Sequence, residues 1–326
     1  MAYDCLMKHI ENYTAIKNIS GVAFNAGKAE LIRFAKHCAP YLTDELSITK
    51  DVVQKWVAPT VHESPNTRKI RVNYVVAFLK YLASQGVSVY MAQPIRQSLL
   101  PYIPYIYTNE ELAKFFTAAD NAKNKPHKKG MFSNRPLIMS VIFKLIYGCG
   151  LRVSEATSLR VGDVDLERGV MTIMQSKLDK ERLVPVHATL LATLREYSSK
   201  VHASSKPGSP FFPSPKGNGH YSQTGIYVAF RDHLWEARIS HGGKGRGPRV
   251  HDFRHTFAVH CLRNWVLGGA DLMVALPYLS AYMGHSSIAS SQYYLRLTAE
   301  MYPDIVMKMK HSFDVMPDLE VLYETN

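Results

Sequence analysis

The sequence lacks the features that mark several large protein classes. Its four cysteines lie far apart and form no C-x-x-C pair, which argues against a thiolate zinc site and a disulfide framework. The N-terminus shows no signal-peptide pattern, and the most apolar segment, 136–147, is short and contains Lys144. We therefore expect a cytoplasmic protein without a membrane span.

Acidic residues are scarce relative to basic ones. The chain has 39 Lys and Arg against 27 Asp and Glu, a formal charge of +12. This balance permits a polyanionic partner and disfavours an acidic one. Apolar residues make up 46% of the chain and charged ones 20%, as in globular proteins. A length of 326 residues exceeds what one compact core usually covers, so we expect two domains.

Helical patterns dominate residues 4 to about 85. Thr49 can cap a helix that continues through DVVQKW, with Asp51 early in it where the helix dipole favours an anion. The longest pattern, 66–84, has large apolar residues four apart, which predicts one sustained helical stripe. That stripe consists of Ile70, Tyr74, Phe78 and Leu82.

Basic residues gather in three places. Arg68, Lys69 and Arg71 begin the 66–84 helix, where cations oppose the helix dipole, so they have another use or are merely solvated. The other two places are loops: 123–130, with Lys128 and Lys129, and the glycine-rich 239–249, with Lys244 and Arg246. All seven are candidate nucleic-acid contacts, and solvated loops are the alternative.

A proline-rich stretch separates the two expected domains. Three prolines between 94 and 104 oppose both helix and central strand, which predicts an extended linker at 101–107. Thr108 and Glu111 then match a T-x-x-E capping box that opens a new helix. The predicted domains are thus residues 1–100 and residues 108–326.

The second domain mixes helices with a hairpin. A nearly all-apolar helix is predicted from Pro136 to Gly148. The β-rich runs VMTIM and RLVPV, joined by SKLDKE, predict an antiparallel pair, and 204–219 is glycine- and proline-rich loop. Helical patterns return after Val250. The expected fold class is mainly α with a small antiparallel β-sheet, in two domains.

Four spaced motifs follow one another in the second domain: GCGLRVSEATSLRVGDVD (148–165), SKLDKERLVPV (176–186), HDFRHTFAVH (251–260) and MGHSSIASSQYY (283–294). Each alone is modest. Together and in this order they resemble the tyrosine recombinase (phage integrase) family. The resemblance covers the second domain, about 220 residues. The first domain is similar to that family's helical core-binding domain only in length and character.

The resemblance implies an active site residue by residue. The family's Arg, Lys, His-x-x-Arg, His and Tyr correspond to Arg152, Lys177, His251, Arg254, His285 and Tyr294. Glu155, three residues after the first of these, is expected to orient Arg152.

The chemistry of phosphodiester cleavage accounts for these residue types. Two guanidiniums can neutralise the non-bridging oxygens without a metal. Tyrosine, with a pKa near 10, needs a base, and His251 can take its proton. Lys177 can protonate the leaving 5′-hydroxyl, and His285 can donate to a phosphoryl oxygen. A phosphotyrosine retains the bond energy, so the reaction needs no cofactor.

Alternatives remain at several positions. Tyr293 is the second candidate nucleophile, and Lys180 or Arg182 could replace Lys177 as the acid. His251 and His255 have the spacing of a zinc pair, but H-D-F-R-H lacks the glutamate of H-E-x-x-H and no third ligand is evident. His255 is expected to be a structural neighbour.

The resemblance also implies partners. It predicts a C-shaped clamp on double-stranded DNA that carries specific sites, and a homotetramer on paired sites that is monomeric without DNA and nucleoid-associated when bound. Integration, excision, transposition and resolution of mobile DNA share this chemistry. Competing functions are a type IB topoisomerase, an inactive DNA-binding regulator and a metal-dependent nuclease. The tail after Pro303 has Leu319 and Leu322, which could dock in cis or on a neighbouring protomer.

Overall fold

The computed structural model divides into two compact units, the first ending at Tyr102 and the second beginning at Ile103. Each is described by itself. The residues that the structure describes are 2–19, 24–95, 103–123, 134–174, 181–214, 219–243, 247–284, 293–298 and 302.

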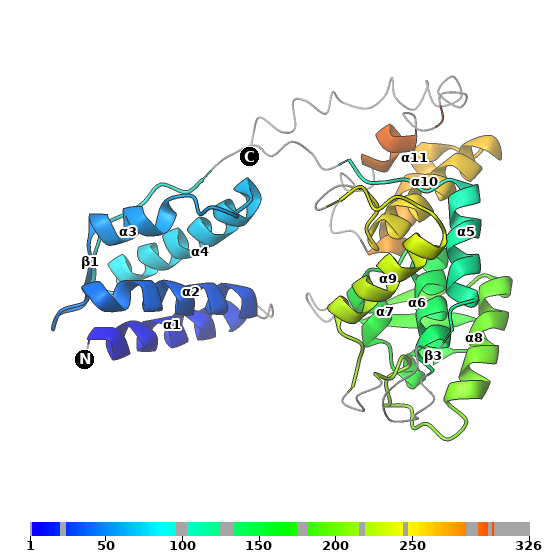
Figure 1. Ribbon diagram of the computed structural model, residues 1–326, viewed down its shortest axis with the longest axis horizontal. Helices are drawn as coiled ribbons and strands as arrows, with labels where there is room; N and C mark the ends of the chain where they lie inside the picture. The colour runs from blue at the N-terminus through cyan, green and yellow to red at the C-terminus, as the bar shows by residue number, and fades with distance from the viewer. Residues whose placement is uncertain are drawn as a thin grey trace. The chain divides into compact units, whose positions relative to one another are not determined.

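The first unit is a group of four packed helices with one short pair of strands. Helices α1, α2 and α4 pack on one another, and α3 packs on α2 and α4 (Figure 1). The two short strands pair in parallel, which the sequence patterns did not predict. The elements are α1 (Ala2–Ile19), α2 (Asn25–Cys38), a 3₁₀ turn (Ala39–Tyr41), β1 (Ser47–Ile48), α3 (Lys50–Val57), α4 (Pro65–Ser84) and β2 (Ser88–Val89).

The buried face of α4 differs in part from the predicted stripe. Phe78 and Leu82 are fully buried, but Ile70 is 49% exposed. A spacing of four residues overshoots one helical turn by about 40° at each step, so such a stripe turns away from the core. The buried row instead continues through Val72, Val75 and Leu79.

The basic residues at the start of α4 have a structural use. Arg71 donates to both oxygens of Glu63 and to the carbonyls of Trp56 and Ala58. Arg68 donates from Nε to the carbonyl of Val57 at 2.9 Å. Both guanidiniums thus satisfy carbonyls at the C-terminal end of α3, where a cation also complements the helix dipole. Whether they or Lys69 also contact nucleic acid stays a prediction.

The second unit is built around one apolar helix, α6, which packs against α5, α7, α8 and α10. Figure 1 shows α5, α6 and α8 side by side. The elements are α5 (Asn109–Asp120), α6 (Arg135–Cys149), α7 (Val153–Ser158), a 3₁₀ turn (Val161–Asp163), β3 (Val164–Asp165), β4 (Val170–Met174), β5 (Glu181–Pro185), α8 (Ala188–Val201), α9 (Gln223–Glu236), α10 (Asp252–Leu267) and α11 (Leu272–Met283). Residues 293–298 are also helical.

Local sequence signals account for several of these boundaries. Thr108 and Glu111 form the expected reciprocal capping box at the start of α5. Thr49 occupies the N-cap position of α3, although its side chain makes no capping hydrogen bond. Helix α6 passes the predicted end at Gly148 and stops at Gly150, whose φ of 58° suits a glycine.

The sheet of the second unit is antiparallel, in the order β3-β4-β5. Strands β4 and β5 form the predicted hairpin, with Thr172 opposite Leu183, and β3 adds a short third strand. The mainly helical fold class with a small antiparallel sheet is therefore confirmed. Over the described residues, none of the helices has the length and apolarity that crossing a bilayer requires.

Two apolar clusters position the site. One surrounds α6 and includes Phe143, Phe230 and Phe253. The other joins α10, α11 and the 293–298 helix, and it contains Tyr294. Helix α10 contributes to both clusters, so its polar residues between them are held by packing on either side.

Candidate active site

A buried carboxylate, Glu155 on α7, gathers three guanidiniums. Arg152 donates from Nη1 at 2.6 Å, and Arg182 on β5 donates from both terminal nitrogens at 2.8 and 3.0 Å. Nη1 of Arg254 lies 3.8 Å from the same carboxylate. Burial alone would raise the pKa of Glu155, but hydrogen bonds from Arg182 and from the backbone of Arg152 lower it to about 2. Glu155 therefore stays charged and holds the arginines together.

Arg254 is the most enclosed of the three guanidiniums, at 2% exposure. It donates to the carbonyls of Gly150 and Met283, each at 2.6 Å. A Cβ at Gly150 would lie 2.4 Å from the Phe257 ring, so this carbonyl reaches Arg254 only because residue 150 is glycine. Burial, and then the charge of Arg152, lower the pKa of Arg254 to about 10, which leaves it charged at neutral pH.

Arg152 is the guanidinium that faces solvent, with a side chain 39% exposed. Its Nη2 donates to the carbonyl of Gly284 at 3.0 Å. Together with His251 it lines a cavity of about 520 Å³, whose wall also includes Tyr227 and Arg249. A ligand that enters this cavity therefore meets a fixed cation.

His251 stands at the N-cap position of α10, on the wall of the same cavity. Its ring centre is 4.8 Å from that of His255, edge to face. His251 is exposed along the cavity wall, but partial desolvation, and then the charges of Arg254 and Arg152, lower its pKa below the usual value of an imidazole. The imidazole is therefore neutral at physiological pH before any anion arrives.

Tyr294, on the 293–298 helix, lies next to His255 and Arg254. It is 3% exposed, and its hydroxyl lies 3.0 Å from Nδ1 of His255. Burial raises its pKa, while a hydrogen bond from Arg254 and the charge of that residue act in the opposite direction. Tyr293 is more exposed than its neighbour, and their ring centres are 6.1 Å apart.

Five of the predicted site residues are thus brought together: Arg152, Glu155, His251, Arg254 and Tyr294. The expected contact between Glu155 and Arg152 is present. Three other predicted positions, Arg68, Lys69 and Arg71, lie on α4 of the first unit. The remaining predicted positions lie outside the described residues, and these are Lys177, His285, Lys128, Lys129, Lys244 and Arg246.

Sequence reasoning missed the position of Arg182, which it considered only as a substitute acid. The side chain of Arg182 is 8% exposed and forms a two-point ion pair with Glu155. It also donates from Nε to the carbonyl of Tyr282 on α11, at 2.9 Å. One signal was available: in an alternating strand Arg182 shares a face with Val184, which is buried.

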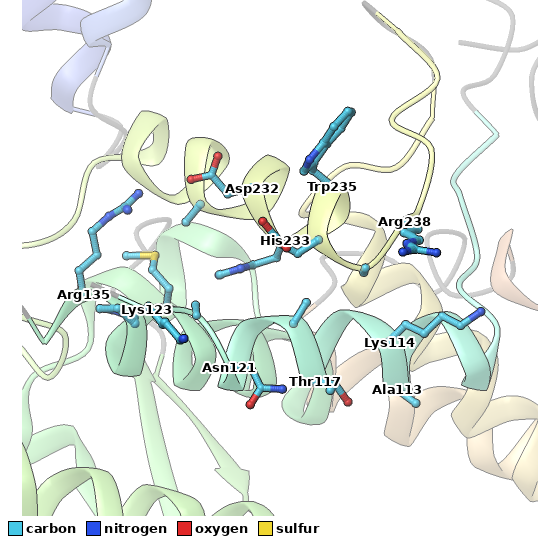
Figure 2. A pocket seen from close by; sticks show the side chains of 17 residues that line it. Ala113, Lys114, Thr117, Asn121, Lys123, Arg135, Asp232, His233, Trp235 and Arg238 are labelled. Carbon is cyan, nitrogen blue, oxygen red and sulfur yellow. The ribbon is translucent and has the colours of Figure 1, made fainter. Parts of the chain in front are cut away.

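A larger groove, of about 1110 Å³, lies between α5 and α9 and contains none of these residues. Figure 2 shows Lys114 and Arg238 near one end and Arg135 near the other, with Trp235 pointing away from α5. Because the groove holds no nucleophile next to a base, the arginine cluster is the better candidate for chemistry.

The fold is mainly helical with a small antiparallel sheet, and its candidate site gathers three arginines around Glu155, one of which, Arg254, interacts with Tyr294. Comparison with known proteins gives the family. The model of the phage integrase family matches residues 106–301, so the chain belongs to that family. It is a site-specific DNA recombinase of the tyrosine class.

Relatives and solved structures agree with this assignment. The y4rB protein of Sinorhizobium fredii, which carries the name of an integrase/recombinase, is 30% identical over 94% of this chain and 97% of its own. Tyrosine recombinase XerA of Pyrococcus horikoshii is 26% identical over 73% of each chain. XerH site-specific recombinase, solved bound to its difH substrate before cleavage, has a similar fold: its TM-score is 0.59 at 21% identity, over 83% of this chain and 74% of that one.

Proposed function

We propose that the chain cuts one DNA strand with Tyr294, holds it as a 3′-phosphotyrosine, and passes it to a strand of a second site. One observation carries the proposal: the hydroxyl of Tyr294 interacts with Arg254, which belongs to the guanidinium cluster around Glu155. This contact supports Tyr294 as a nucleophile that acts next to cations able to hold a phosphate.

The charge of the cluster fits that of the reacting group. Three guanidiniums and one carboxylate leave a charge of +2, because His251 is neutral. Attack of a tyrosinate on a phosphodiester gives a phosphorane with two negative charges. Fixed cations stabilise that charge without reorganising during the reaction, which is the largest contribution in many enzymes.

Roles follow from position. Arg152, exposed at the cavity, receives a non-bridging oxygen first, and Arg254 receives the charge that develops next to Tyr294. His251, on the cavity wall, donates to a phosphoryl oxygen once the anion raises its pKa. Lys177 and His285 keep the roles predicted from the sequence, as acid for the 5′-oxygen and as a phosphoryl hydrogen-bond donor.

Assembly and biological role also belong to the proposal. We expect a homotetramer on two paired DNA sites and a monomer without DNA, acting in the cytoplasm on nucleoid DNA. Lambda integrase, which has a similar fold, was solved bound to DNA, which supports DNA as the partner here. Arg68, Lys69, Arg71, Lys128, Lys129, Lys244 and Arg246 remain candidate DNA contacts. Mobilisation of DNA by integration or excision is the proposed context.

Covalent capture tests the chemistry without knowledge of the site. Duplexes with a randomised core and a nick would be incubated with the chain, and covalent adducts recovered after denaturation and sequenced. Adducts of the native chain should be enriched in one DNA sequence. The DNA in these adducts should be attached to Tyr294. Tyr294→Phe should bind that DNA yet form no adduct, whereas Tyr293→Phe, the matched control, should react normally. Adduct formation by Tyr294→Phe would refute the assignment.

The same substrates separate the competing functions. Loss of the adduct with a chelator would favour a metal-dependent nuclease. Relaxation of a plasmid that lacks the captured sequence would favour a topoisomerase. DNA binding without any adduct would favour an inactive regulator.

A further inference from the structure

The hydroxyl of the proposed nucleophile has a second polar neighbour besides Arg254. Nδ1 of His255, on α10, lies 3.0 Å from Oη of Tyr294, and the two ring centres are 5.6 Å apart. At this distance the phenol O–H can donate a hydrogen bond to an unprotonated Nδ1. His255 therefore contacts the atom that would attack phosphorus.

The surroundings of Tyr294 make such a contact useful. Burial raises the pKa of the phenol, so the hydroxyl by itself resists losing its proton. Arg254 favours the anion but cannot accept a proton, because a guanidinium has no acceptor lone pair. A neutral imidazole in direct contact with Oη supplies what Arg254 cannot.

His251, the acceptor predicted from the sequence, is placed for another task. It lines the cavity next to Arg152, where a phosphate would enter, and its ring meets the edge of His255. The two histidines are one helical turn apart on α10 and so share a face. One of them contacts the nucleophile and the other faces the ligand.

We propose that His255 is a further catalytic residue, the group that takes the proton of Tyr294 as the phenol oxygen attacks the scissile phosphorus. The inference rests on the proposed phosphotyrosine chemistry and assigns one of its proton transfers to a residue expected to be only structural.

The step balances without an added reactant. A lone pair of Oη forms the O–P bond, the P–O5′ bond breaks, and its electron pair goes to the 5′-oxygen. The phenol proton moves to Nδ1 of His255, which becomes an imidazolium. The 5′-oxygen takes a proton from the predicted acid, Lys177. Religation runs these transfers in reverse.

The neighbouring charges set when His255 can accept. Arg254 and Arg152 disfavour a second cation near Tyr294 and His251, and Glu155 opposes them. A phosphodiester adds a negative charge next to the arginines and so favours the imidazolium. In the proposed step, bound DNA therefore favours transfer of the phenol proton to His255.

Two substitutions separate proton transfer from positioning. His255→Asn keeps a polar acceptor near the position of Nδ1 but cannot take a proton, and His255→Gln moves the polar group toward the position of Nε2. With the captured nicked duplex, both should form adduct about 100-fold more slowly at neutral pH, the lower range for loss of a general base. Their rates should rise with pH beyond the native plateau, because hydroxide then removes the phenol proton.

The chain offers a matched control on the same helix. Nδ1 of His260 lies 3.0 Å from the hydroxyl of Tyr147, the same distance as in the His255–Tyr294 pair. His260→Asn should leave the rate and its pH profile unchanged. Circular dichroism and binding of the duplex would show that each variant is folded.

A measurement without DNA tests the contact itself. The ¹⁵N resonance of Nδ1 in His255 should shift between native chain and Tyr294→Phe, since that variant lacks the hydroxyl. An unchanged resonance overturns the inference whatever the chain does to DNA. Native-rate cleavage by His255→Asn with a native pH profile overturns it as well, and leaves the proposed function standing. If native chain forms no adduct with any duplex, the proposed function fails and takes this inference with it.

Discussion

Removal of the charge on Glu155 tests whether the arginine cluster is held by its carboxylate. Glu155→Gln keeps the shape and two hydrogen-bonding atoms but leaves three guanidiniums without their anion. The pKa of Glu155 falls from 4.5 to about 2 on folding, which corresponds to about 3 kcal/mol of stability at neutral pH. The Glu155 side chain is 7% exposed, so solvent screening reduces this little.

The direction of the pKa shift of Glu155 predicts a second measurable effect, a dependence of stability on pH. Because the folded-state pKa is depressed, this stabilisation is complete above about pH 4.5 and is lost as pH falls toward 2. Native chain should therefore lose stability over that window, and Glu155→Gln should lose less of it. The substitution should also weaken the hold on Arg152 and Arg182, since each donates to this carboxylate.

Urea unfolding of the full chain measures both effects. In a Trp56→Phe background, the tryptophan fluorescence comes only from Trp235 and Trp265, which both lie in the second unit. Glu196→Gln is the matched control, because Glu196 pairs with Lys200 at 2.6 Å while 68% exposed, and loss of such a solvent-screened pair should change stability far less. Equal unfolding free energies of Glu155→Gln and Glu196→Gln across pH would refute the reasoning.

Two of three further substitutions probe the candidate site, and the other probes the first unit. Gly150→Ala places a Cβ 2.4 Å from Phe257 at a φ of 58°, so it should destabilise the second unit by about 1–3 kcal/mol. It should also slow adduct formation, because it displaces the carbonyl that Arg254 binds. Unaltered unfolding and cleavage would contradict this. Arg71→Met should destabilise the first unit by about 3 kcal/mol through the unpaired Glu63, as seen by Trp56 fluorescence. Arg254→Ala should slow adduct formation roughly 100- to 1,000-fold on the captured duplex while binding persists, and a native rate would remove Arg254 from the site.

Local signals predicted most of the fold because they act over a few residues. The capping box at Thr108, the apolar run of α6 and the alternation of β4 and β5 each depend on neighbours within one turn or one strand. The parallel pairing of β1 with β2 joins residues about 40 apart through two positions each, and no local pattern encodes it. Likewise, Arg71 on α4 donates hydrogen bonds to carbonyls at the C-terminal end of α3, a different helix.

The candidate site shows the same difference between local signals and long-range contacts. Spaced motifs predicted Arg152, Arg254 and Tyr294 as site residues, because the prediction needs only residue type and order along the chain. They did not separate the tasks of His251 and His255, since both sit on one face of α10 and only the approach of the 293–298 helix decides which one meets the hydroxyl. Arg182 was undervalued for the same reason: its partner Glu155 is 27 residues away on another element. The proton transfer that we propose therefore depends on packing between helices, and substitutions at His255 test it most directly.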